Sequence, residues 1–124
     1  MNIKEFVKRA LAQDPRNVFE KTNIDITFIP KTLKDFYRYA NPIDVEIYVE
    51  GNPIHFFGVD VLNKIQDEYS LGNERFVFAN SNGDPIYLYE ERVYTRYHGS
   101  GIIEDELISD RFEEFLDLLG KVEK

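Results

Sequence analysis

The chain has 124 residues, of which 43% are hydrophobic and 31% charged, and its formal charge is −8. The length indicates one domain, and the hydrophobic fraction is too high for a disordered chain of this charge. Because the chain has no cysteine, disulfides, thiolate nucleophiles and cysteine-based metal sites are excluded. We therefore expect a single domain over residues 1–124.

Two helices are predicted in the first third of the chain. Over residues 3–13, apolar residues recur at every third or fourth position, which is typical of an amphipathic helix. This helix should end at Asp14, because the residue before a proline avoids the helical region. Residues 16–30 are compatible with either a short strand or an extended linker. A second helix is predicted to begin near Pro30 and to end at Asn41.

The hydrophobic period then changes from about four residues to two, which indicates strands. Residues 44–50 alternate as in a strand with one solvent-exposed face, and residues 54–57 follow as a second strand after turn residues. Asp60 is a suitable cap for a third helix, whose buried face would include Leu62 and Ile65.

A hairpin is the clearest local prediction. Two apolar segments, 76–79 and 86–89, flank a turn that contains Asn82-Gly83, and this dipeptide supplies the positive φ angles of a tight hairpin turn. The pair Glu90-Glu91 is unfavourable for a turn by composition. Alternation nevertheless resumes after it, so another antiparallel strand is predicted.

The last helix is predicted from Ser109 to Leu119, with Ser109 as its cap. Consecutive strands with short connections, and helices grouped around them, predict an α+β fold. We expect an antiparallel sheet of about four to six strands with helices packed on it.

The negative charge is concentrated in the second half of the chain. Residues 1–62 contain 8 Lys or Arg and 9 Asp or Glu, whereas residues 63–124 contain 7 and 14. Such a domain should repel nucleic acid and anionic lipid and should favour a basic protein partner. Acidity also keeps proteins soluble, which is the simpler interpretation. No apolar stretch has the length of a signal peptide or a membrane span, so a cytoplasmic location is expected.

The two histidines give little support for catalysis. His55 lies within a predicted strand, and His98 precedes a glycine-containing loop; neither has the spacing of a helical metal site. An enzyme that uses His98 with a carboxylate such as Asp84 is one hypothesis. The stronger expectation is a protein without catalytic residues, metal or cofactor.

Two groups of acidic residues are not explained by helix formation. One is the predicted turn Glu90-Glu91, and the other is Glu104-Asp105-Glu106, which is predicted to lie in a loop. Charges of this kind chiefly speed association and select partners. These five residues are the predicted partner-binding surface.

The order of motifs over roughly residues 26–119 resembles a known superfamily. The residues that carry the resemblance are Ile29-Pro30, Leu33, Phe36-Tyr37, Ala40-Asn41, Phe56-Phe57-Gly58-Val59, Phe78-Ala79, Gly83-Asp84-Pro85-Ile86, Val93-Tyr94, His98 and the segment 109–116. This ordered set is similar to the SUKH superfamily, named partly after a yeast cell-wall-synthesis regulator. Two features differ from the usual pattern: Pro42 replaces a frequent glycine, and the central hairpin has no tryptophan.

The resemblance implies an α+β domain with a curved antiparallel sheet and no known catalytic site. Many bacterial members of the superfamily look like immunity proteins, which bind and neutralise a toxin domain, often a nuclease. The resemblance assigns structural roles to six residues: Gly58, Gly83, Asp84, Phe112, Phe115 and Leu116. It therefore implies an immunity-type binding protein with a basic toxin domain as its partner. The alternative is a regulatory or scaffolding module of the same fold.

Overall fold

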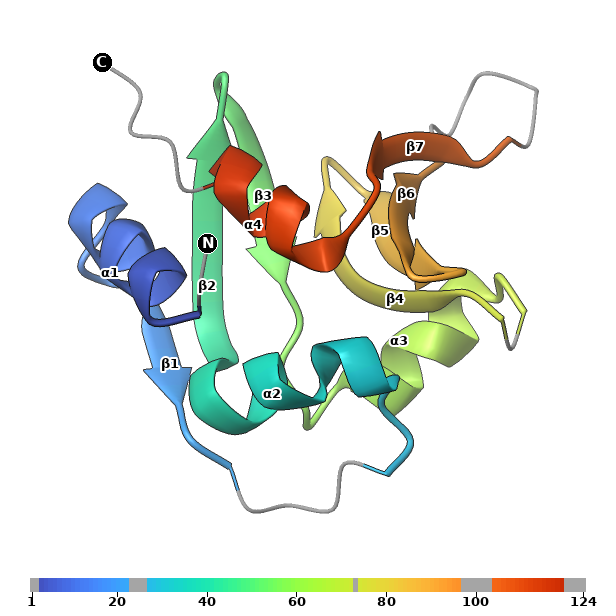
Figure 1. Ribbon diagram of the computed structural model, residues 1–124, viewed down its shortest axis with the longest axis horizontal. Coiled ribbons are helices and arrows are strands. Elements are labelled where there is room, and N and C mark those ends of the chain that lie inside the picture. The colour runs from blue at the N-terminus through green and yellow to red at the C-terminus, as the bar shows by residue number, and fades with distance from the viewer. Residues whose placement is uncertain (1–2, 23–26, 73, 97–103, 120–124) are drawn as a thin grey trace.

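The computed structural model describes residues 3–22, 27–72, 74–96 and 104–119, which form four helices and seven strands (Figure 1). In chain order these are α1 (Ile3–Gln13), β1 (Val18–Glu20), α2 (Lys31–Ala40), β2 (Asn41–Val49), β3 (Asn52–Phe56), α3 (Leu62–Tyr69), β4 (Phe76–Ser81), β5 (Asp84–Tyr89), β6 (Arg92–Thr95), β7 (Glu106–Ser109) and α4 (Phe112–Leu119). The α+β prediction is confirmed. The sheet has one strand more than the largest number expected.

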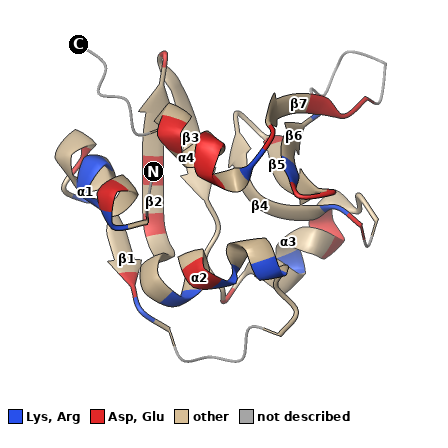
Figure 2. Cartoon of the chain, viewed as in Figure 1, with Lys and Arg blue, Asp and Glu red and all other residues tan. Residues whose placement is uncertain are grey.

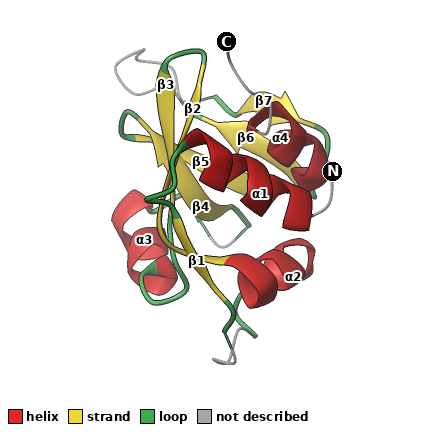
Figure 3. Cartoon of the chain, turned by 90° about the vertical axis from the view of Figure 1, so that its left-hand side faces the viewer, coloured by secondary structure: helices red, strands yellow, loops and turns green. Residues whose placement is uncertain are grey.

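The seven strands form one antiparallel sheet in the order β1-β2-β3-β4-β5-β6-β7, so each strand pairs with its neighbour in sequence. Figure 3 shows α1, α2 and α4 on one side of this sheet and α3 on the other. No helix in the described ranges combines the length and the apolar character needed to cross a membrane.

Three local predictions are corrected at the ends of elements. Ser109 does not cap the last helix, because it ends β7 by pairing with Val93, and its hydroxyl donates to the Arg111 carbonyl at 2.8 Å. The helix α4 therefore begins only at Phe112. Asp60 does not cap α3, whose preceding residue is Val61 and which has no side-chain cap hydrogen bond.

Phenylalanine rings fill the space between the sheet and three helices. Phe56 of β3 lies at the centre, with its ring centroid 5.7 Å from that of Phe6 in α1 and 5.8 Å from that of Phe36 in α2. On its other side are Phe78 of β4 and Phe115 of α4, at 6.2 and 6.3 Å. All five are buried. This ring cluster joins elements that are far apart in sequence.

The β4–β5 turn has the predicted conformation. Asn82 and Gly83 both have positive φ, at 52° and 88°. The β5–β6 turn has the same feature with no glycine, since Glu90 and Glu91 have φ of 50° and 67°. A residue with a Cβ in this left-handed region costs roughly 1–2 kcal/mol. The chain therefore retains two glutamates at positions where Asn-Gly would be more stable.

Gly58 is a glycine that a close backbone approach requires. A Cβ at this position would lie 2.5 Å from the carbonyl oxygen of Pro42. We expect Gly58→Ala to reduce the free energy of unfolding by about 2 kcal/mol or more, measured by urea denaturation. The control is Gly51→Ala, where φ is +81° but no atom lies within 4 Å of the added Cβ, so only backbone strain is introduced. A loss at Gly58 no larger than at Gly51 would contradict this account.

Candidate functional site

The five predicted partner-binding residues lie in two groups at opposite ends of β6. Glu90 and Glu91 form the turn that leads into β6. At the other end, Thr95 of β6 pairs with Glu106, the first residue of β7, and the preceding residues 104 and 105 lie beside it in sequence. A four-residue strand separates the two groups by roughly 13 Å.

Asp105 is held inside the fold by two arginines and a tyrosine. Its carboxylate accepts hydrogen bonds from Arg75 Nε and Nη2 at 3.1 and 2.8 Å and from Arg96 Nε at 3.3 Å. The Tyr87 hydroxyl also donates to it. The side chain is only 21% exposed. This carboxylate therefore fastens the start of β7 to the sheet rather than facing a partner.

The hydrogen bonds from Arg75, more than any other contact, hold the pKa of Asp105 well below the usual range for a carboxyl group. Burial, together with the hydrogen bond to Asp105, raises the pKa of Tyr87 to about 12. At neutral pH the carboxylate is therefore charged and the phenol neutral. A carboxylate with so low a pKa is a poor general base near neutral pH.

Tyrosine rings extend this arrangement over β5 and β6. Tyr87 stacks on Tyr94 with 6.2 Å between ring centroids, and Tyr89 lies 5.8 Å from Tyr94. The Arg75 guanidinium lies 4.1 Å from the centre of the Tyr89 ring. We call this set the tyrosine–arginine cluster: Arg75, Tyr87, Tyr89, Tyr94, Arg96 and Asp105. It links the strands β5 and β6 to the residues that directly precede β4 and β7.

The other four predicted acids are exposed. Glu91 accepts a hydrogen bond from the Thr32 hydroxyl, which links the β5–β6 turn to α2. Exposed acids also follow β7 and begin α4. We define the acidic surface by its exposed members: Glu90, Glu91, Glu104, Glu106, Asp110 and Glu113. Figure 2 shows acidic segments at the end of β5, at the start of β7 and along α4.

The structure describes one of the two histidines considered for catalysis. His55 is exposed on β3, opposite Glu46 and Asn80, and its ring lies 5.4 Å from that of Phe57. His98 lies outside the described residues. Within the described residues, no three metal-ligating side chains of the histidine, cysteine, aspartate or glutamate type are grouped.

The residues with implied structural roles lie in a turn, at the start of a strand and in the core. Gly83 is in the β4–β5 turn and Asp84 begins β5. The apolar residues on one face of α4 are buried: Phe112, Phe115, Leu116 and Leu119.

The chain matches no protein-family model, and comparison with curated proteins and with solved structures finds no match. The resemblance to the SUKH superfamily therefore rests on the sequence motifs alone.

Proposed function

We propose that this protein is an immunity-type binding protein that acts in the cytoplasm. In this proposal it neutralises a basic toxin domain, such as a nuclease, by direct binding and without catalysing a reaction. The sequence motifs shared with the SUKH superfamily support this choice. The observation that carries it is the acidic surface, whose six members are all exposed. Some of them also have a contact within the fold: Glu91 accepts from the Thr32 hydroxyl, and Asp110 lies 3.8 Å from Arg92.

The charge of this surface suits such a partner. A nuclease must attract phosphate, so its active site carries positive potential, and an acidic surface is complementary to it. Exposed charges at an interface mainly raise the rate of association and exclude wrong partners. Asp105 is not part of this surface in the proposal, because Arg75 and Arg96 already occupy its carboxylate.

Backbone strain in the β5–β6 turn also supports the proposal. Glu90 and Glu91 occupy left-handed positions, whereas the β2–β3 and β4–β5 turns each have a glycine at such a position, Gly51 and Gly83. Strained residues that persist in a fold are often retained for function. In this proposal the two glutamates are retained because their carboxylates meet the partner.

The function is tested by co-expression with the toxin domain encoded by the neighbouring gene. We expect cells to survive when both are produced, and the two proteins to co-purify. If the toxin still kills and the proteins do not co-purify, the proposal fails for that pair. A gene with no toxin neighbour, whose product captures a housekeeping protein from resting cells, would favour the regulatory alternative instead.

The double variant Glu90→Asn/Glu91→Gly separates stability from binding. We expect it to raise the free energy of unfolding by about 1 kcal/mol, because left-handed strain is relieved. We also expect it to slow association with the toxin domain, measured by stopped-flow fluorescence. The control is Glu50→Asn, the same kind of change in the β2–β3 turn, which should leave association unchanged. Unchanged association in the double variant would show that this turn does not meet the partner.

A further inference from the structure

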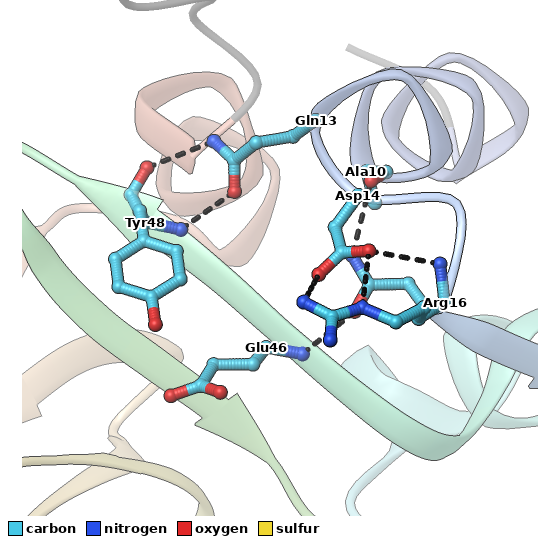
Figure 4. A network of polar contacts seen from close by, with 7 residues as sticks. Ala10, Gln13, Asp14, Arg16, Glu46 and Tyr48 are labelled. Carbon is cyan, nitrogen blue, oxygen red and sulfur yellow. Dashed lines mark hydrogen bonds and ion pairs between the residues drawn. The ribbon is translucent and has the colours of Figure 1, made fainter.

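The two edges of the sheet differ in how they are protected. At the first edge, β1 has three residues and covers only Asn41–Asp44 of β2. Side-chain amides cover the next part of β2. Asn17 Oδ1 accepts from the Glu46 N–H at 2.9 Å, and Gln13 both donates to the Tyr48 carbonyl at 3.0 Å and accepts from its N–H at 2.7 Å (Figure 4).

Further polar contacts hold these covering residues in place. Asn17 is buried and donates to the Ala10 carbonyl at 3.0 Å. The Asp14 carboxylate accepts hydrogen bonds from the backbone N–H and from the guanidinium of Arg16. Figure 4 shows this network beside β2. The Glu46 N–H and the N–H and C=O of Tyr48 are therefore hydrogen-bonded within the chain and are not available to another strand.

At the opposite edge β7 is the last strand of the sheet, and no described strand lies on its far side. In an antiparallel strand, alternate residues direct their N–H and C=O groups away from the neighbour. Among the described residues, no backbone hydrogen bond from outside the sheet reaches these groups of β7. Leu107 on β7 is 52% exposed, and the exposed residues Glu104, Glu106 and Asp110 flank it.

We infer that β7 accepts an extended, basic segment of the partner protein as an eighth strand. In this mode, main-chain hydrogen bonds supply affinity and the flanking charges select the sequence. Acidic residues at this edge favour a lysine- or arginine-bearing strand. They oppose a second copy of this chain, which would bring like charges together. The inference deepens the proposed function and rests on it, because it names where the partner binds.

A peptide of alternating lysine and valine tests the inference without the toxin domain. In amide-resolved NMR of the full chain, we expect shift changes at Glu106–Ser109 and in β6, with slower hydrogen exchange at β7. A peptide of the same sequence with alternate nitrogens methylated keeps the charge but cannot complete the ladder. It should cause no such change. An alternating glutamate–valine peptide should also fail.

Two variants provide a matched comparison. Glu106→Lys should abolish the shift changes, whereas Glu46→Lys, at an exposed acid beside the covered edge, should preserve them. The inference would be overturned if the peptide caused no shift changes, or caused them at β2 or at acidic residues over the whole surface. Equal binding of the methylated peptide would also overturn it. So would a dimer whose β7 amides are protected before peptide is added. Because these readouts do not involve toxin neutralisation, their failure is distinct from failure of the proposed function.

Discussion

Replacing Phe56 by alanine is expected to reduce the free energy of unfolding by about 3–5 kcal/mol. The Phe56 side chain contacts rings from α1, α2, β4 and α4, so its removal leaves a cavity that no single element can close. Since the free energy of unfolding of a small domain is only about 5–15 kcal/mol in total, the variant should be close to unfolding. Urea denaturation followed by circular dichroism measures the loss.

The matched control for this prediction is Phe28→Ala, because Phe28 is 37% exposed and has no ring contact among the described residues. We expect a change below about 1 kcal/mol there. If Phe56→Ala were tolerated as well as Phe28→Ala, the five-ring cluster would not be the centre of the core.

Asp105→Asn is expected to destabilise the protein by about 2–3 kcal/mol at pH 7, because two partly buried arginines lose their charge partner. The pKa of Asp105 is lower in the folded state than in the unfolded state, where it is about 4. Its contribution to the free energy of unfolding is therefore complete above the unfolded-state pKa, and it declines as the pH falls toward the folded-state pKa. The wild type and the variant should therefore converge in stability as the solution is acidified below pH ~4. Urea denaturation at several pH values measures this.

The control is Asp67→Asn, which alters an exposed acid on α3. This substitution should change the free energy of unfolding little at any of the pH values. A difference between wild type and Asp105→Asn that stayed constant from neutral to acidic pH would contradict the assignment of this carboxylate to the arginine contacts.

Much of the fold could be predicted because its signals are local. Helical periodicity identified α1 and α2, and Asn82-Gly83 identified the β4–β5 hairpin. The strands β1 and β7 could not be identified in this way. β1 has only three residues, and β7 begins at Glu106, where the sequence predicted a loop. Each of these strands is defined by pairing with a neighbouring strand.

The candidate site was predictable only in part. The exposure of Glu90, Glu91, Glu104 and Glu106 agrees with what charge patterning suggests. The internal role of Asp105 was missed, because its main partner Arg75 is 30 residues away in sequence. No spacing rule connects the two residues, and only the sheet brings them together.

The most direct test of the acidic-surface proposal is the affinity for the neighbouring toxin domain at increasing salt concentration. We expect binding by wild type to weaken with salt, and Glu104→Lys/Glu106→Lys to bind much more weakly at low salt. Glu68→Lys, on the remote helix α3, should behave like wild type. Affinity that is independent of salt and equal in all three proteins would contradict the account.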